Sequence, residues 1–150
     1  MRQIPDLWVD SFSVFQSFQL FPHFSALENV LFPLELSSTK RARAELVNKA
    51  RTLLDQLGLG DRLEHFPAQL SGGEQQRVAI ARSFAAEPTL LLADEPTGNL
   101  DTETGLRVME QFESLRAQHQ LTVLMVTHDP AIAMQADRCL RMTAGQLSEG

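Results

Sequence analysis

Residues 89–95 read Thr-Leu-Leu-Leu-Ala-Asp-Glu, and this stretch decides the fold class of the 150-residue chain. A short, unbroken apolar run that ends in acids is typical of a strand buried on both faces of a parallel sheet. A helix is expected over about 102–118, a second buried strand over 121–127, and a short helix over 130–136. Strand, helix, strand, helix is the α/β pattern, in which ligands bind at the carboxyl ends of the strands.

Two amphipathic helices are expected before this stretch. Apolar residues recur at helical spacing between residues 39 and 57, and Gly58 stands where a C-terminal cap is wanted. A second helix begins at Ser71, because Ser71 and Glu74 form a capping box, and it ends before Pro88.

The first part of the chain carries a weaker pattern. Residues 1–12 show no clean periodicity, so we leave them as an unassigned segment. Residues 13–36 are rich in Phe and Leu and are interrupted by Pro22 and Pro33, which predicts a strand that leaves the core, a loop and a short helix.

Composition excludes several classes of protein. The formal net charge is −6, and no basic run is long enough to follow a phosphate backbone, so nucleic acid is not an expected partner. The single cysteine, Cys139, excludes an internal disulfide and a cysteine-rich metal site, and we expect it to be a buried structural thiol. No apolar run approaches the roughly 18 residues of a membrane span, so we expect a cytosolic protein that meets a membrane only through a partner.

Acidic and imidazole side chains follow the two predicted core strands. Asp94 and Glu95 come directly after the first strand and His128 after the second, which places them on the same rim of the sheet. Asp94 fits a carboxylate that holds Mg²⁺ where nucleotide phosphates arrive. Glu95 points differently and fits an acceptor that orients or deprotonates a water attacking the terminal phosphate. Without further motifs, each residue also has a purely structural explanation. Asp94 and Glu95 could belong to an ordinary acidic loop after a strand, and His128 could be a hydrogen-bonded histidine at a strand end.

A glycine-rich helix start offers a site for an anion. Residues 70–75, Leu-Ser-Gly-Gly-Glu-Gln, place exposed backbone amides and the Ser71 hydroxyl at a helix N-terminus. Unpaired N–H groups and the helix dipole both favour phosphate there. A good N-cap after a loop is the alternative, although glycines in the first turn cost stability and so call for a reason.

Residues 70–82, LSGGEQQRVAIAR, resemble the signature motif of the ATP-binding-cassette (ABC) ATPases. The resemblance runs from Ser13 to the end of the chain, about nine-tenths of its length. The other matching stretches are 14–16 (Q-loop), 26–30 (start of the helical subdomain), 90–97 (Walker B), 98–101 (D-loop) and 126–129 (switch histidine). Within the family, residues 26–30 and 98–101 resemble the subgroup that powers lipoprotein release and macrolide export.

The resemblance implies that some of the matching residues act on the nucleotide that the same subunit binds. It implies that ATP and Mg²⁺ are the cofactors, that Gln16 touches Mg²⁺ and senses a membrane partner, and that Asp94 supports the same ion. It implies that Glu95 acts on the attacking water and that His128 contacts the terminal phosphate. Without the motif order, an ordinary loop glutamine is the favoured interpretation of Gln16.

The resemblance also implies partners. Ser71, Gly72, Gly73 and Gln75 face the nucleotide bound by an opposite subunit, and Asp101 communicates across that dimer interface. The partners are a second copy or another ABC ATPase, together with a transmembrane permease. The expected location is the cytoplasm, at the inner face of the plasma membrane through the permease.

The implied fold is a partial P-loop NTPase-like α/β sheet with an α-helical subdomain. Residues 13–150 form the partial ABC ATPase domain, with the helical subdomain at about 26–83 and core sheet elements at about 13–20 and 87–150. The chain has no Gly-x-x-x-x-Gly-Lys-Ser/Thr stretch, whose amides and lysine hold the phosphates. The family places this Walker A loop before the Q-loop, so we expect an N-terminal truncation that removes it and its strands.

Two readings of function stay open. The first is the ATP-hydrolysing subunit of an ABC transporter for export or lipoprotein-type transport, with weak or absent nucleotide binding in this chain. The second is a non-catalytic interaction protein that docks on a permease or on an intact ATPase. The missing strands are expected to leave apolar flanks of the two core strands uncovered, which favours aggregation.

Overall fold

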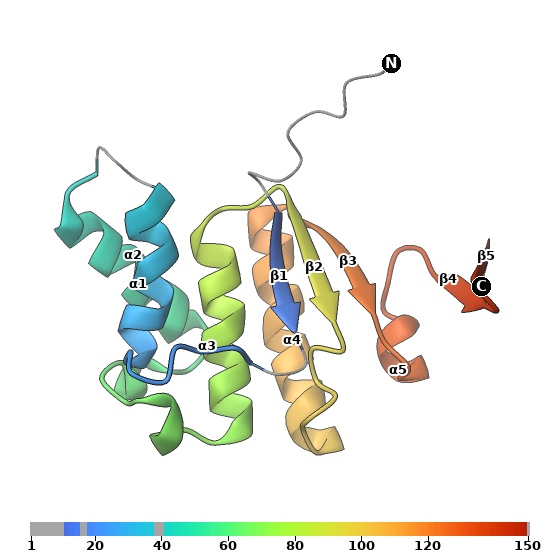
Figure 1. Ribbon diagram of the computed structural model, residues 1–150, viewed down its shortest axis with the longest axis horizontal. Coiled ribbons are helices and arrows are strands. Elements are labelled where there is room, and N and C mark those ends of the chain that lie inside the picture. Colours follow the sequence, from blue (N-terminus) through green and yellow to red (C-terminus); the bar gives the residue numbers. More distant parts are fainter. Residues whose placement is uncertain (1–10, 16–17, 38–40, 150) are drawn as a thin grey trace.

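The computed structural model describes residues 11–15, 18–37 and 41–149. Strands and helices alternate in its second half, as the sequence predicts, and a group of helices precedes them (Figure 1). The strands are β1 (Ser11–Phe15), β2 (Leu90–Asp94), β3 (Thr122–Val126), β4 (Leu140–Thr143) and β5 (Gln146–Glu149). The α-helices are α1 (Ala26–Ser37), α2 (Arg43–Gln56), α3 (Gly72–Ala85), α4 (Thr102–His119) and α5 (Pro130–Ala133).

The core sheet is parallel, which confirms the α/β prediction. It has the order β1-β2-β3, and its register pairs Leu92 with Ser13 on one side and with Leu124 on the other. Parallel strands place their carboxyl ends on one rim, so Asp94 and the residues after Val126 share that rim. Strands β4 and β5 form a separate antiparallel hairpin, drawn in red beyond α5 in Figure 1.

Strands β2 and β3 are covered on one face, not on both as the apolar runs predicted. Leu91 and Ala93 are buried against the helices, and Val123 and Met125 are partly buried on the same face. The described helices leave the opposite face open, as the view in Figure 1 shows with the sheet in front of α4. Apolar side chains on that face are therefore exposed, as expected for strands whose flanks are uncovered.

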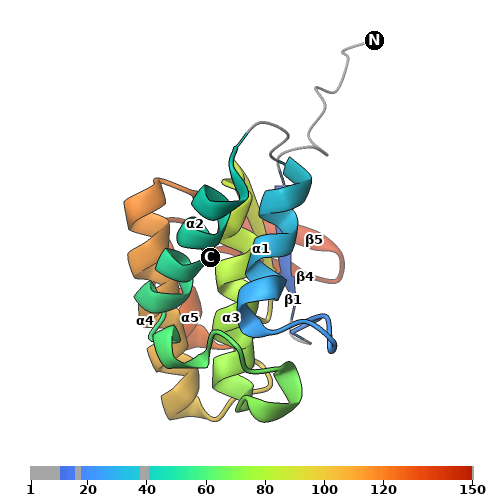
Figure 2. The same ribbon diagram turned by 90° about the vertical axis from the view of Figure 1, so that its left-hand side faces the viewer.

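Helices α1, α2 and α3 form a compact group beside the sheet (Figure 2). Their apolar faces meet in a core that continues into α4, where the rings of Phe84 and Phe112 lie 5.8 Å apart in an edge-to-face arrangement. Lys49 of α2 donates to the Ala85 carbonyl at 3.0 Å and pairs with Glu87 at 2.7 Å, which ties α2 to the end of α3.

Several element boundaries differ from expectation. Helix α2 begins at Arg43, later than residue 39, and ends as predicted with Gly58 in a left-handed conformation at φ +68°. Pro33 does not interrupt α1 but lies inside it. Strand β1 begins at Ser11, within the segment that sequence periodicity left unassigned.

Cys139 is exposed, which corrects the expectation of a buried thiol. It lies just before β4, whose residues are all exposed, so no core is available there to cover it. Among the described helices, none is both long enough and apolar enough to cross a membrane.

Candidate functional site

Glu95 leaves β2 in a strained backbone conformation. Its φ is +44°, a left-handed backbone angle that residues other than glycine rarely adopt. The Glu95 N–H donates to the Val126 carbonyl at 2.9 Å, which ties the turn to the end of β3. Strain of about 1–3 kcal/mol at such a residue persists only where its surroundings hold it. The turn separates the Glu95 side chain from that of Asp94, which stays exposed at the end of β2.

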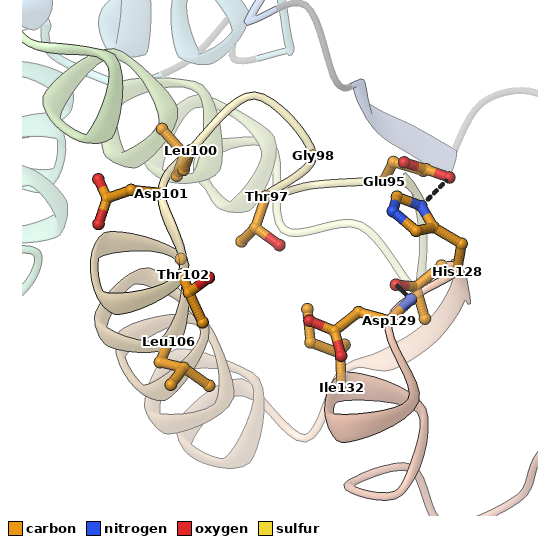
Figure 3. Close-up of a pocket in the computed structure, with 12 residues that line it drawn as sticks. Glu95, Thr97, Gly98, Leu100, Asp101, Thr102, Leu106, His128, Asp129 and Ile132 are labelled. Atoms are coloured by element: carbon orange, nitrogen blue, oxygen red, sulfur yellow. Dashed lines mark hydrogen bonds and ion pairs between the residues drawn. The ribbon is translucent and has the colours of Figure 1, made fainter.

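Glu95 and His128 are in direct contact at the rim. The Nδ1 atom of His128 lies 2.7 Å from a carboxylate oxygen of Glu95, with side chains 77% and 26% exposed respectively (Figure 3). The hydrogen bond with Glu95, and then the carboxylate charge, raise the pKa of the His128 imidazole above its ordinary value of 6.5. The two residues that sequence analysis placed on one rim therefore form one hydrogen-bonded pair.

A cavity of about 200 Å³ opens beside this pair. Its walls come from the loop between β2 and α4, the first turns of α4, and the segment from β3 into α5 (Figure 3). The lining residues are Glu95, Thr97, Gly98, Leu100, Asp101, Thr102, Gly105, Leu106, Thr127, His128, Asp129 and Ile132.

Asp101 and Asp129 shape the cavity by capping the two helices that line it. Asp101 accepts from the Thr104 N–H at 3.0 Å, and this bond holds the pKa of the Asp101 carboxyl below its usual range. Asp129 accepts from the Ala131 N–H at 2.8 Å. Both carboxylates are thus fixed in direction by backbone donors, and Figure 3 shows where the two side chains lie.

The start of α3 has the predicted capping box. The Ser71 hydroxyl accepts from the Glu74 N–H at 3.3 Å, and the Glu74 carboxylate accepts from the Ser71 N–H at 2.8 Å. Arg62 also pairs with Glu74 at 3.0 Å. The pKa of the Glu74 carboxyl is lowered, chiefly by its hydrogen bond with the Ser71 backbone. The Gln75 side chain donates to the Leu70 carbonyl at 3.0 Å, so it is held at the same turn.

Two close packing contacts join the start of α3 to the cavity wall. A Cβ atom on Gly72 would lie 3.3 Å from Leu100, and one on Gly73 would lie 2.6 Å from Thr104. Glycine at these positions therefore lets α3 approach residues 98–101 and α4 closely. This close approach explains why two glycines occur in the first turn of a helix, where they cost stability. Ser71 itself is exposed beside them.

The structure brings together some of the predicted residues and not others. Glu95, Asp101 and His128 line one cavity, and the glycines of α3 pack against its wall. Asp94 is on the same rim but outside the cavity lining, and Gln16 lies outside the described residues. Sequence reasoning missed Asp129 and Thr102 as lining residues, although the Asp-Pro and Asp-Thr pairs at two helix starts were a signal for caps.

The chain belongs to the ABC transporter ATPase family. The family described as "ABC transporter" matches residues 4–98, and the match begins within the segment that sequence periodicity left unassigned. With it come the class and the fold: part of an ABC ATPase cassette of the P-loop NTPase type.

Three curated relatives show which ABC proteins the chain is similar to. The chain is 56% identical to the uncharacterized ABC transporter ATP-binding protein YbbA of Escherichia coli over 91% of this chain and 59% of YbbA. It is 50% identical to the macrolide export ATP-binding/permease protein MacB of Rhodopirellula baltica, over 91% of this chain and 20% of MacB. It is 47% identical to the lipoprotein-releasing system ATP-binding protein LolD of Syntrophus aciditrophicus, over 89% of this chain and 59% of LolD.

Solved cassettes share the fold. The ATP-binding cassette MJ0796, in a dimeric post-hydrolysis state bound to ADP and Pi, superposes with a TM-score of 0.80 at 37% identity. The superposition covers 93% of this chain and 62% of MJ0796. This chain therefore spans about three-fifths of the length of that cassette and of YbbA.

Proposed function

We propose that the chain acts as the ATP-binding and ATP-hydrolysing subunit of an ABC transporter for export or lipoprotein-type transport. The Glu95–His128 contact at the mouth of the cavity carries this proposal, because it joins a carboxylate acceptor to a titratable donor on the sheet rim. The names of MacB and LolD support the type of transport. The family membership supports ATP as the nucleotide.

In the proposed mechanism, the two residues of the pair act on different atoms. The Glu95 carboxylate is the acceptor that orients the attacking water, within hydrogen-bond reach, and takes its proton. His128 keeps Glu95 in place through Nδ1 and presents the other edge of its ring to the terminal phosphate. The left-handed backbone at Glu95 holds the carboxylate at this position before nucleotide arrives.

The described residues fit Mg²⁺ as an ion that arrives with the nucleotide. Among residues 11–15, 18–37 and 41–149, no group of three or more His, Cys, Asp or Glu side chains converges to hold a metal. Mg²⁺ is commonly bound by one or two carboxylates together with substrate phosphates and waters. The exposed Asp94 carboxylate at the end of β2 is the proposed ligand, and Gln16 is the proposed second contact. Bound Mg²⁺ would supply charge neutralisation at the phosphates.

The start of α3 is proposed to serve a nucleotide held by another subunit. Ser71 is exposed, and the glycine amides at the helix N-terminus favour an anion. Ser71, Gly72, Gly73 and Gln75 are the proposed contacts, and Asp101 lies near them across the Gly72–Leu100 contact. The dimeric state of the MJ0796 cassette supports an opposite ATPase subunit as the partner.

A permease is the proposed membrane partner, and an aromatic patch is its proposed contact. The patch is formed by Phe21 and Phe24 of the loop before α1 and by Phe32 of α1, and its rings lie 5.1 to 5.8 Å apart. Phe21 and Phe32 are 40% and 36% exposed. Exposed aromatic clusters of this kind are common at protein interfaces.

Titration of a fluorescent ATP analogue with Mg²⁺ tests the proposal directly. Saturable binding and release of phosphate, with phosphate release lost in Glu95→Gln and kept in Glu103→Gln, would support it. Glu103 is the matched control because it is exposed in the first turn of α4 and does not line the cavity. A folded chain that neither binds the analogue nor releases phosphate, yet captures an intact ATPase of this family, would favour the interaction protein instead.

A further inference from the structure

The loop of residues 18–25, which precedes α1, is tied to the last turn of α3 by one arginine. Arg82 donates from Nη1 to the Gln19 carbonyl at 2.7 Å and from Nη2 to the Phe18 carbonyl at 3.3 Å. The Arg82 side chain is partly buried, and this burial lowers the pKa of its guanidinium. A planar guanidinium can serve two carbonyls at once, whereas a lysine ammonium is a single point donor.

Gln19, which receives the shorter of these bonds, has a strained backbone. Its φ is +48°, in the left-handed region that favours glycine. Such a residue persists only where neighbouring contacts hold it. The described contacts at Gln19 include the short bond from Arg82, so this bond opposes relaxation of the turn.

The same arginine reaches the aromatic patch. Its guanidinium carbon lies 5.8 Å from the centre of the Phe21 ring, a distance at which a cation and an aromatic face attract. From the other side, fully buried Asn29 accepts from the Phe21 N–H at 2.9 Å and donates to the Phe21 and Phe24 carbonyls at 3.2 and 3.0 Å. Phe21 is thus held between α3 and α1.

We propose that Arg82 is a positioning residue that locks the strained turn at Gln19 and the aromatic patch to α3. Helix α3 runs from the Ser71 capping box to the turn that holds Arg82, so this one helix connects the proposed nucleotide-facing turn with the aromatic patch that Arg82 contacts. In the part of this inference that rests on the proposed function, a permease pressing on Phe21 displaces α3 with the loop. Without the arginine, the loop would move by itself and α3 would stay in place.

Amide hydrogen exchange measured by NMR tests the lock without nucleotide or permease. The reporters are the Phe21 N–H, bonded to Asn29, and the Phe24 N–H, bonded to the Phe21 carbonyl at 3.1 Å. Arg82→Lys is expected to speed their exchange about tenfold relative to amides inside α3, because a lysine ammonium cannot replace both bonds that the guanidinium makes to the two loop carbonyls. Arg107→Lys, at an exposed pair on α4, is the matched control and should change nothing.

A second substitution separates positioning from general stability. Gln19→Gly removes the strain, because glycine adopts a positive φ freely. In the Arg82→Lys background it is expected to return the protection of Phe21 and Phe24 toward that of the unchanged chain. Equal acceleration across α3 and the loop, or no recovery with glycine, would overturn the proposal.

The test remains decisive if Arg82→Lys does not fold. Gln19→Gly in the otherwise unchanged chain should then slow the exchange of Phe21 and Phe24, and faster exchange would contradict the strain. Because no measurement here involves ATP, a failure of this proposal and a failure of the proposed ATPase function are told apart.

Discussion

Glu95 combines a strained backbone with a short contact to an exposed histidine, and this makes the pair sensitive to pH. The pKa of His128 is raised in the folded chain, chiefly by the hydrogen bond with Glu95. A raised pKa means that the pair stabilises the folded state fully below the unfolded pKa of about 6.5. The contribution is lost as the pH rises through the higher folded pKa. His128 therefore couples the geometry of the rim to its protonation.

Glu95→Gln is expected to lower the pKa of His128. Glutamine keeps a hydrogen-bonding group beside Nδ1 but removes the charge that favours the imidazolium. Titration of the His128 ring signals by NMR measures the change. Asp129→Asn is the matched control, because Asp129 makes the smallest of the contributions that raise this pKa. A drop in Asp129→Asn as large as that in Glu95→Gln would show that the contact with Glu95 does not set the pKa.

Contact between α3 and α4 depends on a missing side chain. A Cβ atom on Gly73 would lie 2.6 Å from the Thr104 Cγ2 atom, which is closer than real Cβ contacts come. The threonine side chain is β-branched and stiff, so it cannot swing aside cheaply. This one glycine therefore sets the distance between the start of α3 and α4, the helix that Asp101 caps.

Gly73→Ala is expected to lower the free energy of unfolding by about 1–3 kcal/mol through overpacking. Thr104→Ser removes the clashing methyl group and should recover most of that loss in the double variant. Denaturant unfolding of the two single variants and the double variant measures the coupling. Gly105→Ala is the control, since its Cβ would find Thr97 at an ordinary 3.4 Å. Additive effects of Gly73→Ala and Thr104→Ser would contradict the clash.

Local sequence signals predicted the elements well where a single interaction sets the boundary. The capping box of Ser71 with Glu74 and the left-handed Gly58 each mark a helix end through one set of backbone bonds, and both are confirmed. Pro33 was misread as a break, although a proline inside a helix is tolerated when packing holds the helix, and Pro33 is buried in α1.

Tertiary contacts decided what local signals missed at the site. The rim shared by Glu95 and His128 follows from strand order alone, so sequence reasoning found it. The bond from Arg82 to Gln19 joins residues far apart in the chain, and so does the bond to Val126 that holds the left-handed backbone of Glu95, so no local spacing reveals either. The burial of only one strand face also depends on what packs against the sheet.

At the scale of the whole molecule, the helices among the described residues cover one face of the parallel sheet and leave the other face open. Leu92, Leu124 and Val126 lie on the open face at 36%, 56% and 58% exposure. The register pairs Leu92 with Leu124, so the exposed apolar side chains are neighbours rather than scattered. Parallel sheets are usually covered on both faces. We therefore expect this apolar face to make the chain associate with itself in solution.

Leu124→Lys is expected to reduce self-association with little effect on folding. The new charge stands in water on the open face, so the free energy of unfolding should change by no more than about 0.5 kcal/mol. Met125→Lys is the matched control on the same strand, because Met125 packs against the core and a buried lysine without a partner should cost about 2 kcal/mol or more. Sedimentation velocity measures association, and urea unfolding measures stability. If Leu124→Lys destabilises the chain as strongly as Met125→Lys, the face is covered in solution by residues of the chain itself, and association must arise elsewhere.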